Sequence, residues 1–231
     1  LSVEAGVGDL RAQELLPLLL EVIDTAEVDD PELSETVEGL REWVDDGARR
    51  QEPERDAGSY DHAEAIRVLD AWWPLLVRAQ FEPGLGEDLY EQVTAVSQID
   101  ESPSGQIGGG EPGSPNQSQP HRGSAFQLGW WSYVDKDLRT VLGEEVDGSL
   151  PEAYCGDGDV DTCRTVLLES LAAAAETPAE EVYPGDEHCD AGDQLCADSV
   201  IHQSVGGIDM WPVHWQNRPT FQVVYQFSGG R

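Results

Sequence analysis

The chain has 231 residues, 39% of them hydrophobic, with seven Trp and six Tyr, which is enough apolar material for one sizeable core and argues against disorder throughout. Its 46 Asp and Glu against 13 Lys and Arg give a formal net charge of −33, which repels nucleic acids and anionic lipid surfaces, so we expect neither as a partner. The acids are scattered through every segment and Lys136 is the only lysine, a pattern that indicates a salt-adapted surface, with an acidic interaction surface as the alternative.

Four helices are predicted in the first part of the chain, because apolar residues recur there at helical spacing. Asp9 is placed to cap the first helix, Pro17 should bend it, and Pro31 is a favourable first-turn residue for the second. Ser59 or Asp61 is expected to cap the third, which has the broadest apolar face. With their caps, the predicted helices cover residues 9–25, 31–44, 59–77 and 89–96.

Residues 102–124 differ from what precedes them. Gly, Pro, Ser, Asn and Gln dominate there and no periodic apolar signal remains, so we predict an exposed loop. The later elements are an aromatic stretch at 126–134, helices at 135–142 and 161–175, and a strand at 220–227 rich in β-branched and aromatic residues.

This order of elements predicts an α+β fold, with a mostly helical N-terminal two-thirds and one or more strands near the C-terminus. The longest apolar stretch, Leu15 to Leu20, is interrupted by Pro17 and is too short to cross a bilayer. No secretory signal is visible, so any signal is expected upstream. The chain divides into a helical region 1–101, a loop 102–124 and a mixed α and β region 125–231.

The four cysteines form two close pairs, Cys155 with Cys163 and Cys189 with Cys196, on segments rich in Gly and Asp. Two local disulfides in an oxidising compartment are the interpretation we favour. Each pair can close a tight loop if its α-carbons come within about 7 Å. The alternative is a zinc site, although the spacing matches no usual zinc finger. Its ligands would be His188, Cys189, Cys196 and His202.

The run GDGDVDT places Asp157, Asp159 and Asp161 at alternate positions, as at the start of a calcium-binding loop. That template then fails, because Thr162 stands where glycine is expected and Leu168 where a bidentate acid is expected. We instead expect Asp159 or Asp161 to cap the helix that follows.

No catalytic triad is inferred from His62, His121 or His214, because a His, a Ser and an acid are expected by chance in a chain of this length. We assign no catalytic, cofactor-binding or metal-binding residue. The tryptophans are expected to pack in the core in preference to lining an acyl pocket. Those considered are Trp72, Trp73, Trp130, Trp131, Trp211 and Trp215.

Several short runs carry a family resemblance. The most specific is VDKDLRTVLG at 134–143, which follows GSAFQ at 123–127 and Trp130. The other runs are DLR at 9–11, YDHAEAI at 60–66, DAWWP at 70–74, YCG at 154–156, CR at 163–164, CAD at 196–198 and NRPTFQ at 217–222. Taken in the order of the chain, these runs resemble the actinobacterial branch of the penicillin acylase (penicillin amidase) family.

The resemblance implies an N-terminal-nucleophile hydrolase of αββα architecture, made as a precursor that cuts itself. A serine then becomes the first residue of the large chain and attacks the carbonyl of a non-peptide amide, with its own α-amino group as base. Family substrates include penicillins, related β-lactams and acyl-homoserine lactones. The family's oxyanion site and calcium site lie in the small chain or earlier in the large chain, so we expect no cofactor here.

We therefore expect this chain to be the C-terminal part of a large chain, inactive alone, with the nucleophile outside it. Ser2 is not assigned as nucleophile, because Asp9 onward already matches a region well downstream of the family's cleavage site. The expected partners are the small chain, the N-terminal part of the large chain and a small amide substrate, and the expected location is extracellular or exported. Departures from the family are the length of 102–122 and Val223 where a second Gln is common. The alternative is a free-standing, non-catalytic acidic binding module.

Overall fold

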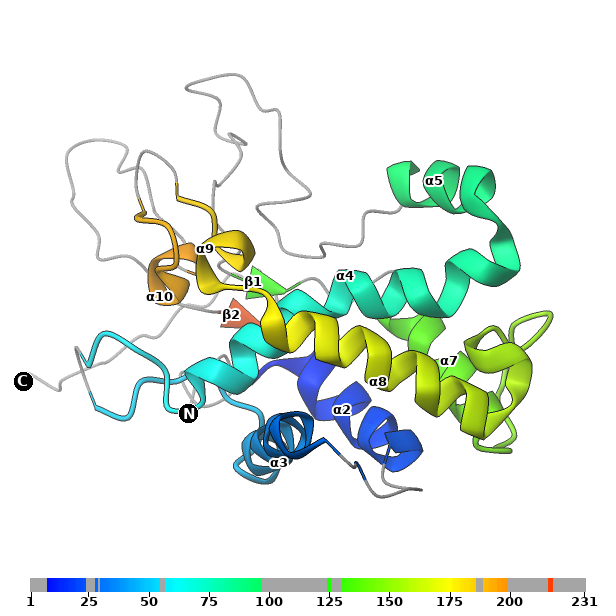
Figure 1. Ribbon diagram of the computed structural model, residues 1–231, viewed down its shortest axis with the longest axis horizontal. Helices are drawn as coiled ribbons and strands as arrows, with labels where there is room; N and C mark the ends of the chain where they lie inside the picture. Colours follow the sequence, from blue (N-terminus) through cyan, green and yellow to red (C-terminus); the bar gives the residue numbers. More distant parts are fainter. Residues whose placement is uncertain are drawn as a thin grey trace, which may run out of the picture.

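The computed structural model describes residues 8–23, 28, 30–54, 57–96, 124–125, 130–185, 189–198 and 216–217. These residues form a mostly helical body (Figure 1). Among its helices, none is long and apolar enough to cross a lipid bilayer. The elements are α2 (Leu10–Ile23), α3 (Pro31–Asp45), α4 (Ala63–Leu85), α5 (Glu87–Val96), β1 (Ser124–Ala125), α7 (Trp130–Val141), the 3₁₀ turn η1 (Cys155–Gly158), α8 (Val160–Glu176), α9 (Ala179–Val182), α10 (Gln194–Ala197) and β2 (Gln216–Asn217).

The core lies around α4 and α8, which run side by side through the middle of the molecule (Figure 1). Helices α2 and α3 cover one side of this pair, and α7 and η1 lie against α2, α4 and α8. Trp72 is fully buried, and its indole N–H donates to Oγ of Ser170 on α8 at 2.9 Å, which satisfies a polar group that burial would otherwise penalise. Fully buried aliphatic side chains fill the same space, each stabilising the fold by about 1.5 to 3 kcal/mol; they include Leu16, Leu19, Leu40, Ile66, Leu76, Leu167 and Leu171.

The starts of α3 and α8 follow the predicted signals. Pro31 is the first residue of α3, and the side chain of Asp30 accepts a hydrogen bond from the backbone N–H of Glu32 at 2.9 Å. Asp159 caps α8 by accepting from the backbone N–H of Thr162 at 2.8 Å, which is the role expected for it. Helix α2 runs continuously through Pro17.

The predicted cap of α4 was wrong. Residue His62 stands at the N-cap without a side-chain capping bond, so neither Ser59 nor Asp61 fills that position. The backbone N–H of Asp61 donates to the carbonyl of Gln51 at 3.1 Å, which holds Asp61 in the connection before the helix. The carbonyl of His62 accepts from the backbone N–H of Ile66 at 3.0 Å, so the first helical bond begins one residue after Asp61.

Helix α7 begins five residues earlier than predicted, inside the aromatic stretch. Trp130 is 3% exposed and its ring centroid lies 5.3 Å from that of Phe81. Burial of this side chain, with Val134 and Leu138 on the same face, extends the helix toward the N-terminus. The predicted strand at 220–227 and nearly all of the predicted loop at 102–124 lie outside the described residues. The strands described, β1 and β2, pair in parallel, with Ser124 opposite Gln216.

The structure contains two disulfides, Cys155–Cys163 and Cys189–Cys196, in the pairing expected from the sequence. Their α-carbons are 4.9 and 5.7 Å apart, within the range that a disulfide spans. The first pair joins η1 to the first turn of α8, and both of its residues are fully buried. Gly156 has a φ of +59° there, and a Cβ atom at this position would collide with the backbone nitrogen of Cys163, so the turn requires glycine.

Candidate functional site

Five charged side chains from distant parts of the sequence meet in the interior, and we call them the ion cluster. Asp9 lies just before α2, Arg11 lies in its first turn, Arg50 follows α3, Asp70 lies on α4, and Asp198 follows α10. Each residue is at most 8% exposed. Charged groups this deeply buried are rare unless they are paired.

Arg50 is the centre of the ion cluster. Its Nε and Nη2 donate to Oδ2 of Asp9 at 3.0 and 2.9 Å, and its Nη2 and Nη1 donate to the two carboxylate oxygens of Asp70 at 2.6 and 2.9 Å. Nη1 also donates to Oδ2 of Asp198 at 2.7 Å. The planar guanidinium group suits this role, because its fixed fork of donors can bind several carboxylates at once. Arg11 adds longer contacts, with its Nη2 3.3 Å from Asp9 and 3.4 Å from Asp70.

Two tyrosines border the ion cluster. The hydroxyl of Tyr183 donates to Oδ2 of Asp70 at 2.8 Å, and it accepts from Nε2 of Gln194 at 2.7 Å. Burial raises the pKa of Tyr60 well above its ordinary value, and the negative charge of Asp198 raises it further. The phenol of Tyr60 therefore stays protonated at physiological pH and adds no charge to the ion cluster.

Pairing keeps the ion cluster charged. Burial opposes ionisation of Asp9, but the charges of Arg11 and Arg50 outweigh it and lower its pKa. Burial also opposes the charge of Arg50, but Asp70, Asp198 and Asp9 together raise its pKa well above the ordinary value. A group that is permanently ionised and already bonded is poorly suited to accept or donate a proton. We conclude that the ion cluster serves to position these segments.

A buried carboxylate outside the ion cluster, that of Asp137 on α7, holds the backbone next to the Cys155–Cys163 disulfide in place. Its two oxygens accept from the backbone N–H groups of Tyr154 and Cys155 at 2.7 and 2.8 Å. Oδ2 accepts in addition from Nε2 of Gln80 on α4 at 2.6 Å. In the part of the chain that the structure describes, Asp9, Asp70, Asp137 and Asp198 are the buried carboxylates, and every one of them accepts such bonds.

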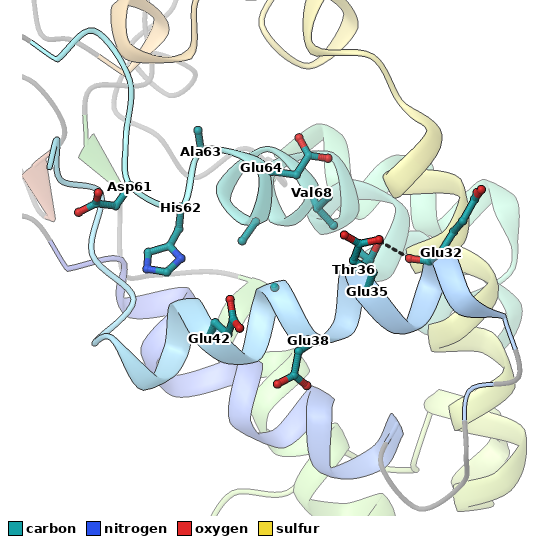
Figure 2. Close-up of a pocket in the computed structure, with 12 residues that line it drawn as sticks. Glu32, Glu35, Thr36, Glu38, Glu42, Asp61, His62, Ala63, Glu64 and Val68 are labelled. Atoms are coloured by element: carbon teal, nitrogen blue, oxygen red, sulfur yellow. Dashed lines mark hydrogen bonds between the residues drawn. The ribbon is translucent and has the colours of Figure 1, made fainter.

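An open groove of about 570 Å³ lies between α3 and the start of α4 (Figure 2). The buried side chains of Val68 and Ala65 form its apolar lining. His62 projects toward α3, with its Nε2 3.3 Å from Oδ2 of Asp46. Solvent-exposed carboxylates on such a rim attract cations weakly, because water and salt screen them. The carboxylates that line this groove, which we call the α3–α4 groove, belong to Glu32, Glu35, Glu38, Glu42, Asp61 and Glu64.

The residues that the sequence analysis singled out lie in different environments in the structure. Trp72, Trp73 and Trp130 are at most 3% exposed, so their predicted core role is confirmed. Asp161 pairs with Arg164 at 2.7 Å. Among the described residues, no group of three or more His, Cys, Asp or Glu is arranged to hold a metal ion. The following lie outside the described residues: Ser2, His121, His188, His202, Trp211, His214 and Trp215.

Sequence reasoning missed the ion cluster, although two signals pointed to it. Asp70 stands within the apolar run of α4 and is 3% exposed, and a lone charge in such a run requires a buried partner. The short runs that carry the family resemblance also contain the other carboxylates, Asp9 in DLR and Asp198 in CAD, as well as Arg11. Asp9 has its predicted capping role too, since its Oδ1 accepts from the backbone N–H of Arg11 at 3.0 Å.

Comparison with known proteins places the chain in a family. A sequence model described as penicillin amidase matches residues 2–220. No curated protein matches the chain at a significant level. The matched range contains the whole ion cluster, Asp137 and both disulfides, so the features described above are all within the aligned region. The chain belongs to the penicillin amidase family.

Proposed function

We propose that this chain is the C-terminal part of the large chain of an amidohydrolase that cleaves non-peptide C–N amide bonds. The observation that carries the proposal is the match to the penicillin amidase family over residues 2–220. The nucleophile is a serine at the N-terminus of the large chain, outside this sequence, and its α-amino group serves as base. The substrates proposed are penicillins, other β-lactams and acyl-homoserine lactones.

The buried polar groups support a scaffold role for this part of the enzyme. Asp9, Asp70 and Asp198 share the guanidinium of Arg50. Ser170 accepts from the indole of Trp72 and donates to the carbonyl of Leu167 at 2.9 Å. Groups bonded in this way hold helices in register, and such support keeps a neighbouring catalytic centre in its productive geometry.

The small chain and the N-terminal part of the large chain are the proposed partners, because they supply the nucleophile and the oxyanion donors. The proposed location is extracellular or exported. The two disulfides support this location, since disulfides persist in oxidising compartments.

Expression of the complete precursor beside the 231-residue chain tests the proposal. The precursor should hydrolyse a chromogenic aryl amide with an apolar acyl group, a penicillin or an acyl-homoserine lactone, and Ala in place of the N-terminal serine of its large chain should abolish turnover. The chain alone should be inactive. Turnover by the chain alone that Ser2→Ala abolishes would contradict the assignment of the nucleophile.

The alternative function is a non-catalytic binding module, and the α3–α4 groove favours it. Its carboxylates surround an apolar lining formed by Val68 and Ala65, which would suit a cationic aliphatic group. The same experiment separates the two functions. A complete gene product without amidase activity, whose groove residues become protected from hydrogen exchange by a cationic peptide, would support the binding module.

A further inference from the structure

The segment 189–198 contributes one member of the ion cluster from outside the main helical body. The Cys189–Cys196 disulfide closes this segment into a loop, and Asp198 follows Cys196 by two positions. Oδ2 of Asp198 lies 2.7 Å from Nη1 of Arg50. The disulfide therefore fixes the part of the backbone from which Asp198 enters the interior.

The ion cluster is balanced in charge without Asp198. Asp9 and Asp70 carry two negative charges, and Arg11 and Arg50 carry two positive ones, so Asp198 brings the net charge to −1. Of the hydrogen bonds that Arg50 donates to the carboxylates, two go to Asp9, two to Asp70 and one to Asp198. Withdrawal of Asp198 would leave Arg50 paired in a neutral cluster, without the penalty of an isolated buried charge.

Polar contacts other than the Asp198 pair also join segment 189–198 to the described body. Nε2 of Gln194 donates to the carbonyl of Ala63 at 3.1 Å and to the hydroxyl of Tyr183 at 2.7 Å. The backbone N–H of Gly192 donates to the carbonyl of Tyr183 at 2.9 Å. Apart from Cys189 and Asp198, the side chains of the segment are exposed or only partly buried. A segment with so little buried surface opens more easily than the core helices.

The two disulfides differ in access to solvent. Cys155 and Cys163 are both 0% exposed and lie within the core. In the second pair Cys189 is 6% exposed and Cys196 is partly exposed. Thiol–disulfide exchange requires a thiolate to reach a sulfur atom. A reductant in solution should therefore reach Cys196 well before it reaches the buried pair.

We propose that the Cys189–Cys196 disulfide is a redox-sensitive clasp for Asp198. A dithiol attacks the sulfur of Cys196, displaces the thiol of Cys189 and then closes to its own disulfide, so that two electrons and two protons pass to the cysteines. The loop is then no longer closed, and Asp198 withdraws from Arg50 while Asp9 and Asp70 keep their bonds. The disulfide lowers the conformational entropy of segment 189–198 when this segment is detached from the body. Loss of the disulfide therefore raises the population of the detached state on the order of 50-fold.

Partial reduction of the full chain with increasing dithiothreitol, followed by alkylation and peptide mapping, tests the order of reduction. We expect Cys189 and Cys196 to be labelled while Cys155 and Cys163 remain joined. Hydrogen exchange of the partly reduced protein should then accelerate on the order of 50-fold at the amides of 192–198, with α4 and α8 unchanged. Equal reduction of both disulfides, or unchanged exchange at 192–198 after selective reduction, would overturn the proposal.

Two variants test the same clasp without a reductant. The double variant Cys189→Ser with Cys196→Ser should show the faster exchange at 192–198 directly. With the disulfide intact, Asp198→Asn should also accelerate exchange there, because it removes the charge that Arg50 holds. Asp190→Asn is the matched control, since Asp190 is exposed in the same loop, and it should leave exchange unchanged. If the two Asn variants behave alike, the ion pair does not hold the segment and the proposal fails.

Discussion

Nη1 of Arg50 lies 2.7 Å from Oδ2 of Asp198, although 148 positions separate the two residues in the sequence. The same guanidinium binds Asp9, 41 positions before it, and Asp70, 20 positions after it. One side chain thus joins the start of α2, the middle of α4 and the segment that follows α10. Because these elements come from both halves of the chain, the complete ion cluster can form only when all of them have come together.

Replacement of Arg50 by Met should destabilise the fold strongly. The variant leaves the carboxylates of Asp9, Asp70 and Asp198 buried without the guanidinium that they share, and loss of one partner from a buried ion pair costs about 3 to 5 kcal/mol. Arg50→Lys should lose less, because it keeps the charge but not the fork of donors. The measurement is the free energy of unfolding in urea, which leaves ionic strength unchanged.

Arg41→Met is the control for this prediction. Arg41 pairs with Glu38 on the surface of α3 at 2.6 Å, with the Glu38 side chain 58% exposed, and an exposed pair contributes about 1 kcal/mol or less. A loss for Arg50→Met no larger than that for Arg41→Met would show that the ion cluster does not stabilise the fold.

Asp137→Asn should destabilise the chain by about 2 to 3 kcal/mol, because an amide NH₂ would face N–H donors that now bond to a carboxylate. The affected donors are the backbone groups of Tyr154 and Cys155 and the amide of Gln80. Asp135→Asn on the same helix is the control, since Asp135 pairs with Arg139 near the surface and its loss should cost less than about 1 kcal/mol. Equal urea midpoints for the two variants would contradict the prediction.

Local pattern predicted most of the helices but not the ion cluster. The apolar period, the first-turn residue Pro31 and the cap at Asp159 lie within or next to the helices they define, so sequence alone is sufficient to find them. The partners of Arg50 depend instead on how separate helices pack. The start of α7 at Trp130 was missed for the same reason, because contact with Phe81 on α4 decides it. The family resemblance was confirmed by the match over residues 2–220.

Tyr60 should make the fold sensitive to alkali. Burial, reinforced by the charge of Asp198, holds its pKa well above the ordinary value of 10.0. The folded state therefore keeps the phenol proton after the unfolded state has lost it. The stabilisation is complete below about pH 10 and declines, by about 1.4 kcal/mol per pH unit, as pH rises toward the folded pKa.

The Tyr60→Phe variant should make the free energy of unfolding decline less steeply with pH, by the contribution of about one proton. The measurement is urea unfolding between about pH 9 and 11.5. Tyr133→Phe is the matched control for loss of a phenol hydroxyl, because Tyr133 is 43% exposed. A slope that is the same in wild type and Tyr60→Phe would show that the phenol of Tyr60 ionises as readily in the folded chain as in the unfolded one.

The acidic surface should make stability depend on salt. With a net charge of −33, self-repulsion destabilises the compact state at low ionic strength. Helix α3 shows the effect locally, since Glu32, Glu35, Glu38 and Glu42 lie along the α3–α4 groove. The Debye length falls from about 30 Å at 0.01 M to about 10 Å at 0.1 M and about 3 Å at 1 M, so added salt screens this repulsion over the spacing of neighbouring carboxylates.

Thermal melts in 0.01 to 0.3 M KCl measure this screening, and melts extended to 3 M KCl include the added burial of apolar surface that high salt favours. We expect the melting temperature to rise across both ranges. The triple variant Glu32→Gln, Glu35→Gln and Glu42→Gln should melt higher than wild type at 0.01 M and respond less to salt, because three of the repelling charges are gone while the shape of the groove is kept. A melting temperature that stays flat or falls with salt would show that the charge is not a salt adaptation, and it would favour the acidic interaction surface instead.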